Sequence, residues 1–190
     1  MAKFEKVSRF AEVDINYPRR KTAESAGYDM EVAEDIVIPS YHVLMEAINN
    51  EHADIVSIDT ETGRINYCPI TLDEMKKVTS KLKAKPTLVP TGMKCKLESG
   101  TYLELSVRSS CPLNYWLFLA NSVGIIDADY YNNEQNEGEI FFQIVNFSPY
   151  DILLKKGDTI GQAIIKNFGI TEDDEASGER IGGFGSTSNE

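Results

Sequence analysis

Several short segments of this sequence place acidic, hydroxyl, basic and glycine residues close together, as sites that bind phosphate or activate water do. The most informative segment is residues 121–130, NSVGIIDADY, in which two aspartates and a tyrosine follow an apolar run that contains one glycine. If this segment forms a hairpin, a carboxylate at its tip, Asp127, can orient a water molecule for attack. A turn aspartate can also cap its own loop, so this segment alone leaves both interpretations open.

Two further segments carry groups that bind phosphate. Residues 108–110, Arg-Ser-Ser, follow an alternating run over 101–107, and an arginine with two hydroxyls at a strand end can bind phosphate oxygens. Residues 180–188, RIGGFGSTS, combine glycine N–H groups, hydroxyls and an arginine with one aromatic ring, Phe184, that could stack on a planar ligand. This run is not a Walker A loop, because no lysine follows its glycines. Taken singly, a surface arginine and a Gly/Ser tail usually have no function.

The remaining candidates for chemistry are two Gly/Asp turns, AGYD at 26–29 and KGDTIGQ at 156–162, and each of them alone is simply a turn. The two histidines, His42 and His52, cannot complete a Ser–His–Asp set with the other segments, and they make a zinc site unfavourable. Nucleophilic catalysis of that kind is therefore disfavoured.

Composition narrows the classes of partner. The 190 residues carry a net charge of −11, which argues against general binding to nucleic acid or to an anionic membrane. The amino terminus has no apolar segment of signal-peptide length, and the strongest apolar run, 115–120, is too short to span a bilayer. Cys68, Cys95 and Cys111 lack metal-ligand spacing and indicate reduced thiols. We expect a soluble, cytoplasmic protein.

Short strands must position most of these segments. The run over 101–107 alternates, with Leu103 and Leu105 on one face, and residues 139–146 are apolar on nearly both faces. Further strand candidates are residues 35–39, 41–45, 151–155 and 160–166. Many short strands separated by turn signals indicate an all-β sandwich, jelly roll or small barrel.

Residues 46–85 break this pattern and predict a small ββα insertion. Two strand-like runs, 53–58 and 64–70, flank a loop in which Gly63 suits the left-handed position of a hairpin. Thr71 and Glu74 form a capping box for a helix. The apolar stripe of this helix consists of Leu72, Met75, Val78 and Leu82. Its lysines are most simply a solvated face.

The last twenty residues, 171–190, are first acidic and then rich in Gly and Ser. Such a segment buries too little apolar surface to order itself, so we expect a flexible arm unless a ligand or a neighbour holds it.

The five segments together change this interpretation. AGYDM, VRSS, NSVGIIDADY, KGDTIGQ and RIGGFGSTS resemble, in this order, the five motifs of the trimeric dUTPases, over about residues 3–45 and 86–188. The resemblance implies an all-β, jelly-roll-like core of the dUTPase type formed by 1–45 and 86–170, with the insertion at 46–85 and an arm at 171–190. It also implies a homotrimer in which three subunits build each site.

The resemblance further implies an activity: hydrolysis of dUTP to dUMP and pyrophosphate, in which Mg²⁺ assists and water attacks the α-phosphorus. Asp127 matches the base that activates the water, and Asp29 matches the acid that holds Mg²⁺ through water, the triphosphate giving the direct ligands. The matches to substrate-binding groups are Asn121, Gly124, Ile125 and Ile126 for uracil, Tyr130 for deoxyribose, Arg108, Ser109, Ser110 and Gln162 for phosphate, and Arg180, Phe184, Gly185, Ser186 and Thr187 in the closing arm.

The sequence departs from the family pattern at several places. Val107 stands where many members have proline, and Phe184 follows Arg180 by one residue fewer than usual. Residues 131–138 lengthen the hairpin after Tyr130. Insertions occur in some phage members, where they are linked to regulatory proteins, so the 46–85 insertion suggests a similar partner and a viral or prophage origin.

Two alternative functions remain open from sequence. A dCTP deaminase shares the fold, but its catalytic glutamate stands three residues before an asparagine that matches Asn146, and this position holds Gln143. A regulatory binding protein that acts through the insertion would keep the fold without needing catalysis.

Overall fold

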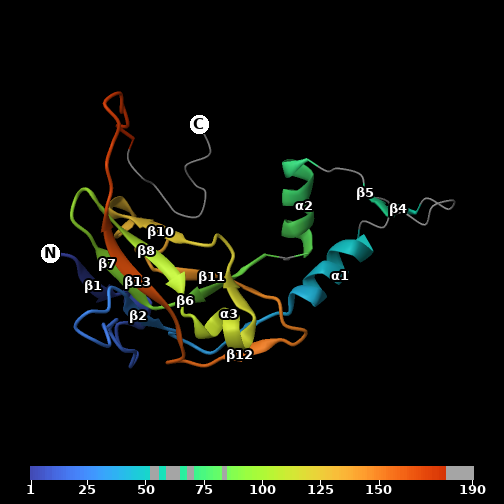
Figure 1. The fold of residues 1–190 in the computed structure, drawn as a ribbon, viewed down its shortest axis with the longest axis horizontal. Coiled ribbons are helices and arrows are strands. Elements are labelled where there is room, and N and C mark those ends of the chain that lie inside the picture. The colour runs from blue at the N-terminus through green and yellow to red at the C-terminus, as the bar shows by residue number, and fades with distance from the viewer. Residues whose placement is uncertain (52–55, 59–64, 68–70, 83–84, 179–190) are drawn as a thin grey trace.

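The computed structural model describes residues 1–51, 56–58, 65–67, 71–82 and 85–178. Short antiparallel strands form a core on one side of the molecule, and two helices with a small hairpin stand beside it (Figure 1). The strands of the core are β1 (Lys3–Lys6), β2 (Tyr28–Glu31), β3 (Ile36–Ile38), β6 (Thr87–Pro90), β7 (Met93–Lys96), β8 (Thr101–Val107), β9 (Leu117–Leu119), β10 (Gly124–Asp127), β11 (Phe141–Asn146), β12 (Ile152–Leu154) and β13 (Thr159–Asn167). The helical elements are η1 (Ser8–Phe10), α1 (Tyr41–Glu51), α2 (Leu72–Leu82), α3 (Ser110–Tyr115) and η3 (Ala128–Tyr130), and β4 (Val56–Ile58) and β5 (Ile65–Tyr67) make the hairpin.

Two sheets enclose the core. One sheet has the strand order β10-β8-β13-β2 and the other the order β6-β11-β9, while β1–β7 and β3–β12 form two-stranded pairs. Alternation explains the packing, because Leu103 and Leu105 of β8 and Phe142 and Ile144 of β11 are almost fully buried, whereas the residues between them are not. The all-β prediction is therefore confirmed.

Most strand predictions from sequence are confirmed, with ends that differ by one or two residues. The predicted strand 101–107 is β8, and those at 35–39, 151–155 and 160–166 are β3, β12 and β13. The strand predicted over 139–146 begins only at Phe141. The two residues before it have other partners: Glu139 forms an ion pair with Arg9, and the backbone of Ile140 bonds to Thr91 and Met93.

The prediction of a strand over 41–45 is wrong, because these residues begin helix α1. The hydroxyl of the buried Ser40 accepts a hydrogen bond from the N–H of His42, and the Ser40 carbonyl accepts one from Leu44, which starts the first turn. The apolar residues Tyr41, Leu44 and Met45 then recur at helical spacing. The Tyr41 ring lies 4.9 Å from that of Phe147, which joins the helix to the core.

The inserted segment contains the predicted hairpin and second helix, but α1 precedes them, so the order is αββα rather than ββα. β4 and β5 pair with Val56 opposite Tyr67. The capping box is confirmed: the Thr71 hydroxyl accepts a hydrogen bond from the Glu74 N–H, and the Glu74 carboxylate accepts one from the Thr71 N–H. The division at residue 46 stays a prediction, and α1 runs across it.

The predicted apolar stripe of α2 is only partly correct. Val78 is buried, but Leu72 is 91% exposed, because it lies in the first turn and outside the packed face. The side chain of Leu82, the loop with Gly63, and Cys68 lie outside the described residues. No helix within the described ranges combines the length and apolar character needed to cross a membrane.

The two described cysteines, Cys95 and Cys111, are free and buried in the core. Burial raises the pKa of the Cys95 thiol to about 12 and also raises that of Cys111. Both thiols are therefore protonated near neutral pH and are poor nucleophiles.

Glycine at 161 is required by a close approach between the two sheets. A Cβ there would lie 2.5 Å from Cζ of Phe142 and 2.7 Å from the Ser106 carbonyl oxygen. We expect Gly161→Ala to lower the free energy of unfolding by about 1–3 kcal/mol, the usual cost of overpacking. Urea denaturation measures this change. Gly169→Ala, where nothing lies within 4 Å of the added Cβ, should leave the unfolding midpoint nearly unchanged. Equal effects of the two substitutions would contradict the packing argument.

Candidate active site

The segment 121–130 forms one side of a pocket of about 190 Å³. Strand β10 brings the segment to the edge of its sheet by pairing with β8, with Gly124 opposite Leu105 and Asp127 opposite Tyr102. The pocket is lined by Asn121, Gly124, Ile125, Ile126, Asp127 and Tyr130 of this segment, and by Leu105, Leu119, Phe141 and Gln143. Six residues that the sequence assigned to one site are therefore brought together.

Backbone geometry explains the shape of this segment. Ser122 has a left-handed φ of 61°, and the chain reverses between the hydrogen bonds Ser122 N–H to Leu119 O and Val123 N–H to Asn121 O. Glycine at 124 permits the close approach of β10 to β8, because a Cβ there would lie 3.0 Å from that of Leu105. The expected hairpin with Asp127 at its tip is not observed, because β9 pairs with β11 whereas β10 pairs with β8, so Asp127 lies at the end of a strand. Asn121 is exposed in the turn that precedes β10.

Asp127 ends β10 and directly precedes η3, with a half-buried side chain at the pocket wall. An ionised carboxylate is a hydrogen-bond acceptor, so it can hold and deprotonate a water molecule that enters the pocket. Its backbone is extended, with φ −77° and ψ 159°.

Tyr130 also lines the pocket and is only 4% exposed. Its hydroxyl donates a hydrogen bond to the Glu139 carbonyl over 3.0 Å and accepts one from the Asn136 amide over 2.7 Å. The ring thus lines the pocket while its hydroxyl is anchored in the chain that follows.

The segments 26–29 and 156–162 meet in the sheet formed by β2, β13 and β8. Gln162 of β13 lies opposite Asp29 of β2 on one side and opposite Ser106 of β8 on the other, and its amide donates to the Ser106 hydroxyl over 3.2 Å. A Cβ on Gly27 would lie 2.9 Å from Cδ of Gln162. Glycine at 27 therefore leaves the room that the Gln162 side chain occupies.

Asp29 carries a buried oxygen, Oδ2, that has no hydrogen-bond partner among the described residues, and its nearest cation is the Lys21 ammonium at 3.7 Å. A buried carboxylate oxygen of this kind requires water or a cation to satisfy it. Within the described part of the chain, no group of three or more His, Cys, Asp or Glu side chains could hold a metal. A hydrated cation that a single carboxylate holds through water fits this donor set better than a protein cage does.

Residues 108–110 follow the end of β8. Arg108 and Ser109 are exposed, and Ser110 begins α3. The Arg108 N–H donates to the Ile160 carbonyl, which fixes the chain as it leaves the sheet. Arg108 and Ser110 line a second hollow of about 410 Å³.

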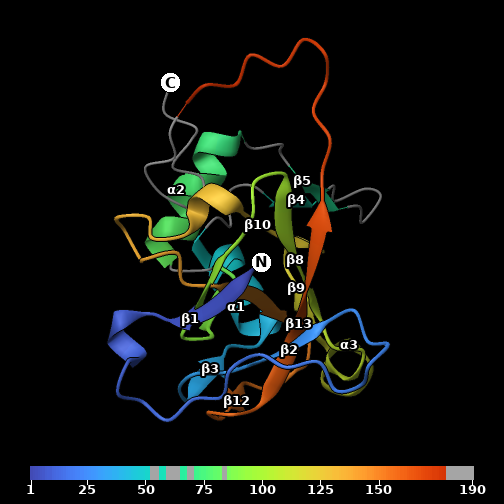
Figure 2. The same ribbon diagram turned by 90° about the vertical axis from the view of Figure 1, so that its left-hand side faces the viewer.

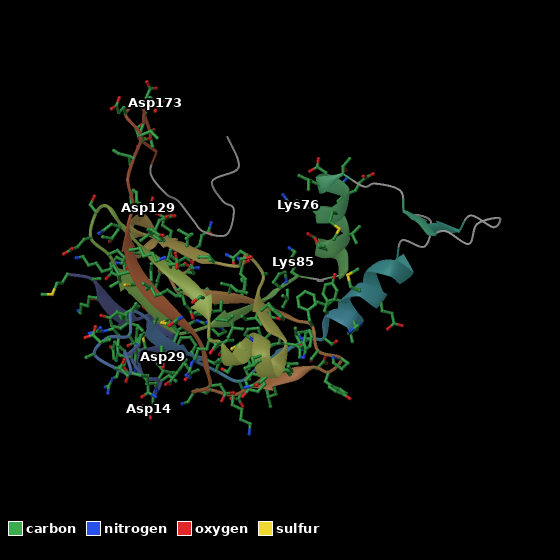
Figure 3. The ribbon with its side chains drawn as sticks, in the orientation of Figure 1. Asp14, Asp29, Lys76, Lys85, Asp129 and Asp173 are labelled. Carbon is green, nitrogen blue, oxygen red and sulfur yellow. The ribbon has the colours of Figure 1, made fainter. Side chains whose placement is uncertain are left out.

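The two groups of predicted site residues lie far apart within one chain. Asp127 pairs with Tyr102 near the start of β8, whereas Arg108 follows its end. Six residues of extended strand span about 20 Å. Figure 3 likewise shows Asp29 and Asp129 on well-separated parts of the core. The arm residues Arg180, Phe184, Gly185, Ser186 and Thr187 lie outside the described residues.

Two pocket residues from β11, Phe141 and Gln143, were not predicted as site residues. They alternate with the buried Phe142 and Ile144, so they face away from the core. The sequence of this strand is apolar on nearly both faces, so it does not show which face lines a pocket. From sequence, Gln143 was noted only because it stands where a dCTP deaminase has its glutamate. The structure gives the pocket a neutral amide at that position.

Comparison with known proteins agrees with this geometry. A family model described as dUTPase matches residues 72–188. The deoxyuridine 5'-triphosphate nucleotidohydrolase of Lactococcus lactis subsp. lactis (strain IL1403) is 34% identical over 97% of this chain and 95% of its own length. The crystal structure of dUTPase from Streptococcus mutans is 30% identical, with a TM-score of 0.60 over 89% of this chain and 98% of that one. The dUTPase from phage phi11 of S. aureus, at 15% identity, shares the fold over 94% of this chain and 97% of its own, with a TM-score of 0.58. This chain is a member of the dUTPase family.

Proposed function

We propose that this protein hydrolyses dUTP to dUMP and pyrophosphate. The observation that carries the proposal is the pocket of segment 121–130, in which Asn121, Asp127 and Tyr130 line one cavity in a chain of the dUTPase family. The dCTP deaminase alternative is not favoured, because Gln143 has an amide where that enzyme needs a carboxylate.

The pocket has the groups needed to bind a deoxyuridine. We propose that Asn121 and the backbone of 124–126 bind the uracil edge, because hydrogen bonds that pair with uracil leave cytosine mispaired. Tyr130 packs against the deoxyribose, where a 2′-hydroxyl has no room. Asp127 takes a proton from the water that attacks the α-phosphorus in line with the departing pyrophosphate.

Positive and polar groups hold the phosphates. Arg108 offers a bidentate charge, Ser109 and Ser110 offer hydroxyls, and Gln162 offers an amide. Asp29, whose buried oxygen has no hydrogen-bond partner among the described residues, would hold Mg²⁺ through water while the triphosphate would give the direct ligands. The chemistry supplied there would be neutralisation of charge on the triphosphate and on the leaving pyrophosphate. A structural Mg(II) ion is named for a mutant of the dUTPase from phage phi11 of S. aureus.

We propose that three copies of the chain assemble each site. The separation of about 20 Å between Asp127 and Arg108 supports this, since one nucleotide cannot reach both ends of β8 in the same chain. Val123 and Ile125, at 40% and 52% exposure, give the start of β10 an apolar surface suited to a subunit contact. Residues 168–178 are exposed and extend beyond the sheets after β13 (Figure 2). We propose that the arm that follows, 180–187, closes over a site of a neighbouring chain.

We further propose that the insertion, 46–85, binds a regulatory protein. Lys76 and Lys85 lie apart from Asp29 and Asp129 in Figure 3. Lys85 lines a hollow together with Leu119, and Leu119 also lines the pocket, so a partner bound at the insertion would lie beside the pocket. The phage phi11 dUTPase is described as having a species-specific insert, and Staphylococcus phage dUTPases are described as controlling the transfer of virulence genes.

The proposed activity is tested by pyrophosphate release in Mg²⁺ from dUTP, dCTP, dTTP and UTP, with ammonia release from dCTP followed in parallel. We expect turnover of dUTP far above the others and no ammonia. Asp127→Asn should lower kcat by about 10²- to 10⁴-fold, the usual contribution of a general base. Asp129→Asn removes the same charge two residues away and should stay within a few-fold of wild type. Asp127→Asn with nearly normal turnover would refute the role of this carboxylate.

Gly27→Ala tests the phosphate half of the site. The added methyl group would displace the flexible end of Gln162, so we expect KM for dUTP to rise about 3- to 10-fold, the cost of one hydrogen bond. Thermal stability should change little. Steady-state kinetics in a Gln162→Ala background supply the control. The glycine substitution should have little further effect on KM there, because the Oε1 and Cδ atoms that the methyl group meets most closely are gone. If the two substitutions raise KM additively, the methyl group at residue 27 does not act by displacing the Gln162 side chain.

Truncation after Glu179 tests the arm. The remaining chain should stay a folded trimer by light scattering, while kcat/KM for dUTP falls by about 100-fold, because the arm no longer positions the substrate. Removing only Asn189 and Glu190, outside the motif, should have little effect. Full activity of the longer truncation would exclude a closing role.

A further inference from the structure

Residues 131–138, which we call the Asn loop, separate Tyr130 from Glu139 and fold back onto Tyr130. The loop backbone turns through left-handed conformations at Asn132, Glu137 and Gly138. A Cβ on Gly138 would lie 2.5 Å from the Tyr130 carbonyl oxygen, so glycine is needed for this close return.

Two buried or half-buried amides inside the loop are aimed at Tyr130. The Asn136 amide nitrogen donates to the Tyr130 hydroxyl over 2.7 Å, and the Asn133 amide nitrogen donates to the Tyr130 carbonyl over 3.0 Å. The oxygen of Asn136 accepts from the Asn133 amide and from the Gly138 N–H, which leaves Asn136 little rotational freedom. The loop therefore holds both the backbone and the hydroxyl of this tyrosine.

The outer side of the loop is tied to the amino-terminal segment. The Arg9 guanidinium makes two hydrogen bonds of 2.8 Å to the buried Glu139 carboxylate, and the Ser8 hydroxyl donates to Glu137 over 2.9 Å. The Ser8 hydrogen bonds lower the pKa of Glu137, so that this carboxylate is ionised near neutral pH. The Lys94 ammonium donates to the Asn132 side-chain oxygen over 2.6 Å. The loop is thus anchored at both ends.

All these contacts hold Tyr130, an aromatic residue that lines the pocket. Tyr130 is 4% exposed and lines the 190 Å³ cavity, while its hydroxyl accepts from Asn136 and donates to the Glu139 carbonyl. If the hydrogen bond from Asn136 were lost, the Tyr130 hydroxyl would be held less firmly. The ring could then move aside and leave room for the extra hydroxyl of a ribose.

We propose that Asn136 is a positioning residue for sugar discrimination: it fixes the Tyr130 ring so that the pocket accepts a 2′-deoxyribose and excludes a ribose. This inference rests on the proposed action on dUTP, and assigns to the Asn loop a role in specificity. Asn136 itself does not line the pocket.

The test compares dUTP with UTP. In Asn136→Ala, the ratio of kcat/KM for dUTP to that for UTP should fall about 3- to 10-fold, the effect of one hydrogen bond, chiefly through KM. Glu134→Ala is the matched control, because Glu134 is exposed in the same loop and makes no hydrogen bond or ion pair to the residues that the structure describes. The control ratio should equal that of wild type. If the dUTP/UTP ratio of kcat/KM falls in both variants, or in neither, the inference is overturned.

A double-mutant cycle separates positioning from general loosening of the loop. Tyr130→Phe removes the hydroxyl, so Asn136→Ala should lower the ratio no further in that background. If Asn136→Ala lowers the ratio further in the Tyr130→Phe background, Asn136 does not act through the Tyr130 hydroxyl, and the positioning role is refuted.

If Asn136→Ala does not fold, Tyr130→Phe makes the same test, because it removes the hydroxyl that accepts the hydrogen bond from Asn136. The ratio should then fall about 3- to 10-fold with Asn136 intact. An unchanged ratio would refute the role of this hydrogen bond.

Binding of the non-hydrolysable α,β-imido analogues of dUTP and UTP, measured by calorimetry, decides the inference without turnover. The preference for the deoxy analogue should fall about 3- to 10-fold in the Asn136 variant alone. Wild type that binds the deoxy analogue selectively but releases no pyrophosphate would refute the proposed hydrolysis and leave the positioning role standing. If wild type hydrolyses dUTP but the preference for the deoxy substrate is unchanged in the Asn136 variant, the proposed hydrolysis stands and the positioning role is refuted.

Discussion

The pairing of β8 with β10 on one edge and with β13 on the other is the constraint on which the rest of the site depends. Backbone hydrogen bonds fix the register, and a slip of one residue would turn every side chain to the opposite face. Through β10 this pairing sets Asp127 at the pocket, and through β13 it sets Gln162 between Ser106 and Asp29. Glycines at 124 and 161 let neighbouring backbone and side chains approach closely enough to maintain that arrangement.

The same constraint separates the functional groups. Because β8 is an extended strand, Thr101–Val107, the residues at its two ends are held far apart and reach different regions of the surface. The exposed apolar side chains on β10 and the exposed segment after β13 agree with the proposed assembly, in which the two ends of equivalent strands in neighbouring copies meet around one nucleotide.

Two segments stand outside the sheets. The αββα segment lies between β3 and β6, and the ring of Tyr41, at the start of α1, packs against that of Phe147 in the core. The Asn loop directly follows the pocket tyrosine and is ordered by side-chain amides rather than by strand pairing. The first segment extends the surface, whereas the second reaches the pocket.

The sequence by itself determined the strands with clear alternation, such as β8, the Thr71–Glu74 cap, and the five motifs that indicated the family and its candidate residues, because these signals are local. Tertiary structure decided what depends on contacts between distant segments. Residues 41–45 are helical because Ser40 caps them and the core receives their apolar face, although their short apolar pattern also suits a strand. Phe141 and Gln143 reach the pocket because β11 turns one face away from the core, and Tyr130 is held by a loop whose amides find partners only after the chain has folded back on itself.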